Sequence, residues 1–345
     1  MVRRALFISV GFAPLVVLMH YALDLDETVE FVLSAAALIP LAWLIGEATE
    51  HAAEHTGPGI GGFLNATFGN APELIIALLA VNEGLNEVVR GSLTGSVIGN
   101  LLLVLGFSLF FGGRGEIDRR SSFIALGLVG ATTLILLIPS VPGWDGDPDS
   151  DTLVAVSIPI AIVLLLAYVG MTWYSLRRHA AMHVASDEEI EGWSLQFALA
   201  VLAGATVITA LVAEILVGTL EVFSHEVGLS EFFVSAVIVA IVGNAAEHGG
   251  AVVVAARGKI KLAAEIALAS SAQVAVFLIP AVALLALLIN PFALSFRPIE
   301  LAALAFSTIV TSILLADGRS SRPKGTILIV AYVAVATAFY IAGDR

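Results

Sequence analysis

The stretch FGNAPELIIALLAV, residues 68–81, is apolar enough for a membrane helix but begins with a polar, helix-breaking group. Asn70, Pro72 and Glu73 stand where a bilayer-spanning helix normally carries hydrocarbon side chains. Proline lacks the N–H that an interior helical turn requires. A charged side chain at the bilayer centre costs about 2.5–3.5 kcal/mol on insertion scales. We therefore expect this stretch to line a buried polar site rather than to face lipid.

The same pattern occurs a second time, as VGNAAEH at residues 242–248. Subtracting 69 from 243 gives an offset of 174 residues between the two stretches. This offset places Gly69, Asn70, Ala71 and Glu73 on Gly243, Asn244, Ala245 and Glu247, and Ser96 on Ser270. The two copies are five predicted helices apart, so they run in opposite directions. Such an inverted repeat is typical of secondary transporters, whose binding site lies between the repeats near the bilayer midplane.

The composition indicates an integral membrane protein. Hydrophobic residues make up 59% of the 345 residues, and charged residues make up 13%, about half the usual share of a soluble domain. Mean hydropathy is +0.98. Apolar runs of about 20 residues, the length of a transmembrane helix, predict an all-α fold with eleven transmembrane helices. They lie at 5–22, 28–46, 60–82, 92–112, 121–139, 152–174, 194–220, 230–256, 262–288, 298–316 and 325–342.

The predicted helices divide the chain into four parts. Residues 1–24 form a leading transmembrane helix, 25–174 a first five-helix repeat, 175–193 a cytosolic acidic linker, and 194–345 a second, inverted five-helix repeat. With a cytoplasmic N-terminus, all basic residues except Arg90, Arg297 and Arg345 fall on the cytoplasmic side, which is 13 of the 16 Lys and Arg. Because cytoplasmic loops carry the excess of Lys and Arg, we expect the C-terminus outside, in the plasma membrane.

The charge and the absence of cysteine restrict the possible partners. Net charge is −13, and there is no cysteine. Thiolate metal sites are therefore excluded, and nothing in this charge balance indicates a nucleic-acid partner. We expect a lipid bilayer, a divalent cation and protons as partners, and a homo-oligomer remains open.

Oxygen-bearing side chains surround the two glutamates in the sequence. Each glutamate follows an asparagine by three residues, which places both side chains on one helix face. In the next helix of each half, a serine shares a face with an amide side chain. Carboxylate, amide and hydroxyl oxygens suit a hard cation such as Ca²⁺. The expected ligands are Glu73, Glu247, Asn70, Asn244, Ser96, Asn100, Ser270 and Gln273, and the expected helix-breaking residues are Gly69, Pro72 and Gly243.

Several less specific interpretations stay open. The two glutamates could be a neutral, protonated pair, and Pro72 could mark a plain kink. His51 and His55 share a face at a spacing that can bind zinc, but without a Glu-x-x-His frame we expect a solvated helix end. His248 points away from Glu247 on a helix, so we expect it to pack or to support a ligand. The segment SDEEIE at 186–191 is expected to be a solvated linker.

Four motifs resemble those of the calcium/cation–proton exchanger (CAX) family, within the calcium:cation antiporter superfamily. They are GNAPELIIALLA (69–80), GSVIGNLLLVLG (95–106), GNAAEH (243–248) and ALASSAQVAVFLIPAV (267–282). The resemblance implies proton-driven Ca²⁺ export with Glu73 and Glu247 as central ligands. It also implies that the second and seventh helices move against a core formed by the third, fourth, eighth and ninth helices. Ala269 departs from the glycine that the family commonly has before its serine pair.

These residues suggest a mechanism in which Ca²⁺ is the transported substrate and H⁺ the counter-ion, with no enzyme activity and no organic cofactor. Two ionised carboxylates in a low dielectric repel each other and are costly. Either Ca²⁺ or protons would relieve that cost, so the empty site would not readily change sides. A Na⁺/Ca²⁺ exchanger, a passive cation channel and a non-transporting scaffold remain as alternatives.

Overall fold

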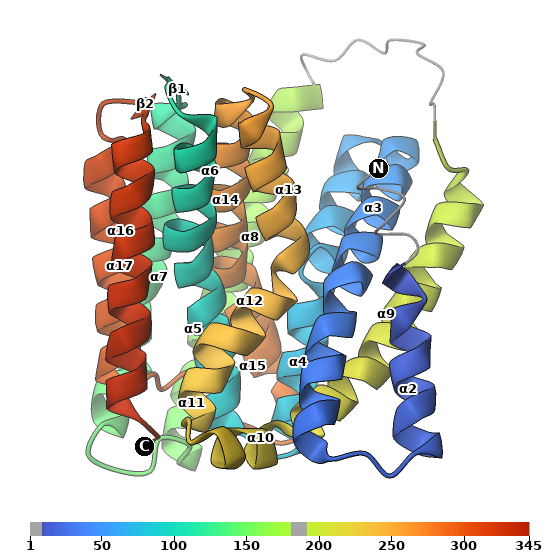
Figure 1. The fold of residues 1–345 in the computed structure, drawn as a ribbon. Helices are drawn as coiled ribbons and strands as arrows, with labels where there is room; N and C mark the ends of the chain where they lie inside the picture. Colours follow the sequence, from blue (N-terminus) through green and yellow to red (C-terminus); the bar gives the residue numbers. More distant parts are fainter. Residues whose placement is uncertain (1–8, 181–191, 345) are drawn as a thin grey trace.

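The computed structural model describes residues 9–180 and 192–344, with side chains except at 57–60, 62–63, 65–66, 173–180, 246 and 248. The regular structure of this part of the chain is helical apart from two short strands, β1 (Gly115–Glu116) and β2 (Arg319–Ser320), which pair antiparallel. The first half contains α2 (Phe12–Ala22), α3 (Glu27–Phe68), α4 (Ala71–Asn82), α5 (Asn86–Ile98), η1 (Gly99–Val104), α6 (Leu105–Gly112), α7 (Arg119–Gly143) and α8 (Asp151–Ala180). The second half contains α9 (Leu195–Gly218), α10 (Leu220–Val227), α11 (Glu231–Phe233), η2 (Val234–Val239), α12 (Ala240–Gly243), α13 (Ala245–Ala256), α14 (Ile260–Gln273), η3 (Val274–Leu278), α15 (Ile279–Ala286), α16 (Pro298–Leu315) and α17 (Arg322–Ala342). Figure 1 shows α2, α3 and α9 on one side of the bundle and α7, α16 and α17 on the other.

Multiple membrane spans are confirmed, although fewer than eleven helices meet a length and hydropathy criterion. Within the described chain, eight helices are long and apolar enough to span a membrane. A ninth is reached if α10 and the helix from Glu231 to Gly243, bent by 112°, count as one span. Of the predicted segment 5–22, only the part from residue 9 onward lies in the described chain. The predicted segment 60–82 is divided by the break between Phe68 and Ala71.

The predicted loop at 47–59 is wrong, because α3 continues helically from Glu27 to Phe68. The helical run nevertheless reverses direction. A Cβ on Gly61 would lie 2.8 Å from the carbonyl oxygen of Ala53. In a straight helix these residues would be about 12 Å apart along the axis. The reversal between them lets the end of α3 lead back into α4.

Both halves contain an interrupted helix at the repeated motif. In the first, α3 ends at Phe68, and Asn70 (φ −105°, ψ 19°) precedes α4, whose first turn contains Pro72. In the second, Asn244 (φ −89°, ψ 8°) separates α12 from α13, and Gly243 is the last residue of α12. Proline is accommodated in a first turn because the N–H there has no partner within its helix.

The bounds of the following helices repeat with the offset of the motif. Adding 174 to the bounds of α4 gives those of α13, and adding it to residues 86–112 gives residues 260–286. In Figure 1, α6 lies above α5, whereas α15 lies below α14, so these equivalent helices run in opposite directions.

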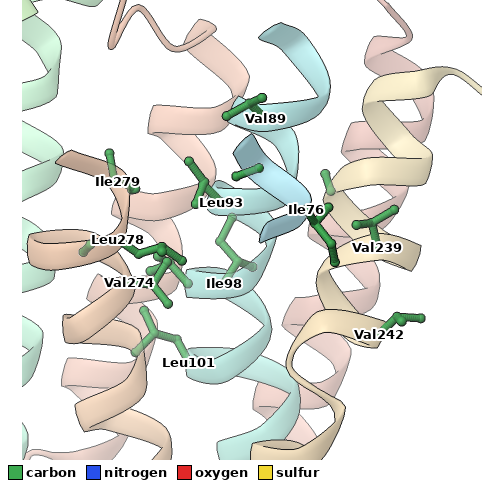
Figure 2. Packing of buried hydrophobic residues seen from close by; sticks show 14 of the residues in the cluster. Ile76, Val89, Leu93, Ile98, Leu101, Val239, Val242, Val274, Leu278 and Ile279 are labelled. Carbon is green, nitrogen blue, oxygen red and sulfur yellow. The ribbon is translucent and has the colours of Figure 1, made fainter. Parts of the chain in front are cut away.

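Buried apolar side chains from both halves fill the space between these helices. Figure 2 shows Ile98 and Leu101 of the first half near Val274 and Leu278 of the second. On another face of α5, Gly95 lies so close to η2 that an added Cβ would be 2.0 Å from a carbonyl oxygen of that helix. Small residues let membrane helices approach this closely.

Two basic residues that were expected in outer loops are buried instead. Arg90 is 0% exposed within α5, and its guanidinium bonds the Asp149 carboxylate and the Ala293 carbonyl, at 3.1 Å from the latter. Arg297 is 9% exposed and donates to the Gly343 carbonyl at 2.7 Å. Both cations therefore hold protein segments together rather than act as free loop charges.

Candidate functional site

The two glutamates of the repeated motif lie near each other at the helix breaks. Glu73 is 7% exposed in the first turn of α4, and Glu247 is partly exposed in the first turn of α13. They are close enough for their negative charges to repel each other. A Cβ on Gly243 would be 3.2 Å from Cγ of Glu73. The second break therefore packs directly against the carboxyl group of the first half.

A chain of hydrogen bonds joins the two halves of the sequence beside these carboxylates. Asn244 donates from Nδ2 to the Ser96 hydroxyl at 2.7 Å. Asn100 donates from Nδ2 to Oδ1 of Asn244 at 3.3 Å and to the Ser270 hydroxyl at 2.9 Å. The Ser270 hydroxyl in turn donates to the Glu247 carboxylate. This network fixes four of the expected ligand side chains around Glu247.

Two buried oxygens at this place have no donor among the described residues. They are Oδ1 of Asn100 and Oε2 of Glu73. A buried acceptor without a donor costs about 1–3 kcal/mol unless something else satisfies it. A cation that prefers oxygen ligands would satisfy both, and carboxylate, amide and hydroxyl oxygens together form the donor set that Ca²⁺ takes.

The expected ligands do not all join this network. Asn70 is 1% exposed at the first break, and its carbonyl accepts from the Leu74 N–H at 3.0 Å. Gln273 ends α14 at a partly exposed position, and no hydrogen bond between described residues links it to the network. Asn100 lies in the π-helical turn η1, and Gln273 directly precedes the equivalent turn η3. Such turns are frequent at functional sites.

The histidines near the end of the second predicted span are partly exposed, and they have protein partners that the sequence-based expectation did not include. His55 donates from Nε2 to the Trp193 carbonyl at 2.7 Å. The His51 ring lies 5.0 Å from the Trp193 ring, and its Nδ1 is 3.2 Å from the Glu54 carboxylate. The end of the linker covers this part of α3, which sequence periodicity could not reveal. Throughout the described chain, no group of three or more His, Asp or Glu side chains could hold a metal. The side chain of His248 and the whole segment 186–191 lie outside the described residues.

Two buried acids were missed by the sequence analysis, Glu30 at 6% exposure and Glu300. Glu300 is 0% exposed in the first turn of α16 and bonds the Thr94 hydroxyl and the Arg297 N–H. The available signal for Glu300 was the same as for Glu73, a carboxylate and a proline inside a predicted apolar span.

Acidic residues also line a cavity of about 310 Å³ between α2, α3 and α9. Glu214 is exposed there, beside Glu27, Glu30 and His20. His20 and Glu30 are 2.9 Å apart.

Comparison with known proteins identifies the family. The model of the sodium/calcium exchanger protein family matches residues 27–177 and 197–341, which include both breaks and both serines of the network. The chain belongs to this family. It is 36% identical over 354 residues to the Ca(2+)/H(+) antiporter of Synechocystis sp., covering 95% of each chain. It is 37% identical over 336 residues to the Ca(2+)/H(+) antiporter ChaA of Bacillus subtilis, covering 94% of each. The solved structure of native YfkE superposes with a TM-score of 0.85 at 34% identity, covering 97% of this chain and 99% of that one.

These matches confirm the family expected from the four motifs. The chain is a multi-pass membrane protein of a transporter family, and it is not an enzyme. Its fold is the helical fold of the YfkE structure.

Proposed function

We propose that this protein exchanges Ca²⁺ for H⁺ across a membrane by alternating access at a site around Glu73 and Glu247. The observation that carries this proposal is the Glu73 carboxyl group at the first break, packed against Gly243 of the second break, beside the network that leads through Asn100 and Ser270 to Glu247. The antiporters of Synechocystis and Bacillus subtilis, 36% and 37% identical, support the same exchange for this chain.

The charge of the site accounts for obligatory exchange. Ca²⁺ between two carboxylates neutralises them, and two protons do the same. With neither bound, two negative charges face each other in a low dielectric, which is costly. Only the neutralised site changes sides readily, so Ca²⁺ released on one side is replaced by protons from that same side, which the site then carries to the other.

The ligand set proposed from the sequence is retained. Seven of its members lie at the breaks or in the network, namely Glu73, Asn70, Glu247, Asn244, Ser96, Asn100 and Ser270. Gln273 ends α14, directly before η3. The two glutamates would also be the proton-binding groups.

Eleven spans in two inverted repeats of five, after a leading helix, form the proposed architecture. The repeated helix bounds and their opposite directions support it. The parts are those expected from the sequence, 1–24, 25–174, 175–193 and 194–345. The basic loops at β1, β2 and between α13 and α14 lie at one end of the molecule in Figure 1. We assign this end to the cytoplasm, with the C-terminus outside and the chain in the plasma membrane.

Movement of α3 and α9 against the core of α4, α5, α13 and α14 would open the site to each side in turn. Rocking of one bundle against a fixed site is the usual motion of inverted-repeat transporters. The extensive packing of α3 on α9 supports a common motion of these two helices.

Vesicles containing the purified protein provide the test. An imposed pH gradient should drive Ca²⁺ uptake, and Glu73→Gln and Glu247→Gln should each reduce it to the level of empty vesicles. Glu116→Gln, which changes an exposed carboxylate in β1, is the matched control and should transport normally. Normal transport by both site variants would refute the two-carboxylate site.

The same vesicles separate the alternative functions. A Na⁺/Ca²⁺ exchanger would respond to a sodium gradient and not to the pH gradient. A passive channel would carry Ca²⁺ without any counter-gradient, and a scaffold would carry none.

A further inference from the structure

Glu300 is a completely buried carboxyl group outside the site described above. It lies at the third position of α16 with 0% exposure. Its Oε2 accepts from the Arg297 backbone N–H at 2.7 Å, and its Oε1 accepts from the Thr94 hydroxyl at 3.0 Å. Both partners are neutral donors.

The nearby cations are engaged elsewhere. Arg90 attracts Glu300 at a distance, but its guanidinium bonds Asp149 and, at 3.0 Å, Glu87. Glu87 adds a repulsion of its own on Glu300. The cluster thus contains three carboxylates and one guanidinium, from Glu300, Asp149, Glu87 and Arg90.

The other neighbouring cation, Arg297, is also committed to different partners. Its guanidinium donates to the Gly343 carbonyl at 2.7 Å and lies 4.5 Å from the centre of the Phe232 ring. No salt bridge between described residues includes Glu300, so its ionised form would be an unpaired buried charge, which proteins rarely keep.

The hydrogen bond to Thr94 connects this carboxyl group to the transport site. Thr94 lies on α5, which also carries Ser96 and leads into Asn100. While Glu300 is ionised, the Thr94 hydroxyl donates to it. When Oε1 takes a proton, the acid O–H can donate to the Thr94 oxygen. The Thr94 hydroxyl is then free to donate to the carbonyl four residues earlier, an arrangement that bends helices.

We propose that Glu300 is a third proton-binding carboxyl group of the transport cycle, which exchanges its proton with the outer side and adjusts α5 through Thr94. This role rests on the proposed function, because it adds a proton to the same exchange. A simpler role is that of a helix cap, since the carboxylate accepts the backbone N–H of Arg297, the residue before the first turn. Asp118, the residue before α7, caps that helix while partly exposed, so a capping carboxylate does not require complete burial.

Infrared spectroscopy of the protein in vesicles tests the proton-binding role without measuring transport. Stepping the outer pH should reveal carbonyl-stretch bands of buried carboxyl groups that gain protons. We expect one such band to persist in the Glu73→Gln, Glu247→Gln double variant and to disappear when Glu300→Gln is added. Glu116→Gln should leave the band unchanged. A double variant without any remaining buried-carboxyl band overturns the proposal, even if Glu300→Gln fails to fold.

Transport measurements test the coupling. The dependence of Ca²⁺ exchange on outer pH gives the number of protons linked to the exchange. In Glu300→Gln this number should fall by about one, while exchange itself persists. Thr94→Val, which keeps the carboxyl group, should shift the midpoint of the infrared band. An unchanged pH dependence in Glu300→Gln would leave Glu300 as a cap only. If the unaltered protein shows the infrared band of Glu300 but no exchange of Ca²⁺ for H⁺, the proposed function is refuted instead.

Discussion

Replacing Gly243 by alanine would show whether the position of the Glu73 carboxyl group determines Ca²⁺ affinity. The substitution adds one methyl group at the end of α12 and removes no polar atom. That methyl carbon would lie 3.2 Å from Cγ, 3.7 Å from Cδ and 3.9 Å from Oε1 of Glu73. The Glu73 side chain must therefore move, while its charge stays the same.

The size of the effect follows from this geometry. Carbon atoms pack best at about 3.5–4.0 Å, so Cγ must move by a few tenths of an ångström. A side chain turned about 30° from its rotamer loses about 0.5–1.5 kcal/mol. Since 1.4 kcal/mol corresponds to a factor of ten, we expect Ca²⁺ to bind about 2- to 12-fold more weakly. Alanine favours a helix over glycine by about 1 kcal/mol, which offsets part of the strain in the fold.

Calorimetric titration of Ca²⁺ into the purified protein gives the affinity, and thermal unfolding checks that the fold is kept. Gly250→Ala is the matched control, because a Cβ there would meet nothing within 4 Å. It should bind Ca²⁺ as the unaltered protein does. If Gly243→Ala also binds Ca²⁺ with unchanged affinity, then Glu73 does not coordinate the ion from this position.

Three further changes test the fold around the site. Arg90→Ala leaves the partly exposed carboxylates of Asp149 and Glu87 without their cation and the buried Ala293 carbonyl without its donor. It should lower the free energy of unfolding by about 1–3 kcal/mol in denaturant titrations, whereas Arg120→Ala on the surface should change it by less than about 0.5 kcal/mol. Gly95→Ala should cost about 1–3 kcal/mol through overpacking against η2, while Gly127→Ala, with open space around it, should be tolerated; equal stability of the two variants would contradict this. The backbone N–H that Asp118 caps holds the pKa of that carboxyl below its usual range. The cap should therefore contribute fully above the ordinary value of about 3.9 and be lost as pH falls through the lower folded value. Hydrogen exchange at the start of α7 should show this loss, and Asp118→Asn should abolish its pH dependence.

The sequence was sufficient to locate the two breaks because their chemistry is local. A proline and a carboxylate in an apolar run are unfavourable in lipid wherever the rest of the chain lies. The offset between the copies then predicted that α4 and α13 correspond, and their bounds differ by that offset at both ends.

The reversal inside α3 could not be found in the same way. Polar residues after position 46 resembled a loop, yet the backbone stays helical there. Glu54, His51 and His55 find partners within α3 and on Trp193, which is more than 130 residues away in the chain. Hydropathy measures the preference of a residue for water, and it contains no information on partners that the fold supplies.

Arg90 illustrates the same limit with a charge. The sequence indicated that Arg90 lies in an outer loop. In the structure its guanidinium donates to the Asp149 carboxylate and the Ala293 carbonyl, and the side chain is buried. Arg90 and Arg297, at the end predicted to face outward, are thus structural, whereas the basic residues with described side chains at the opposite end are mostly exposed. Among the residues that the structure describes, the asymmetry of free positive charge is therefore greater than the count of residues indicated.

The two halves repeat in backbone more closely than in ligands, and this makes the two glutamates unequal. Adding 174 to Asn100 gives Val274, and subtracting it from Gln273 gives Gly99, so the amide that organises the network has no counterpart. Glu247 already accepts the Ser270 hydroxyl. Glu73 instead lies against Gly243, and its Oε2 has no donor among the described residues. A cation entering this site would complete the coordination of Glu73 and compete with a hydrogen bond at Glu247. The repeat thus supplies two similar breaks, and the departures from it determine which carboxylate depends more on the ion.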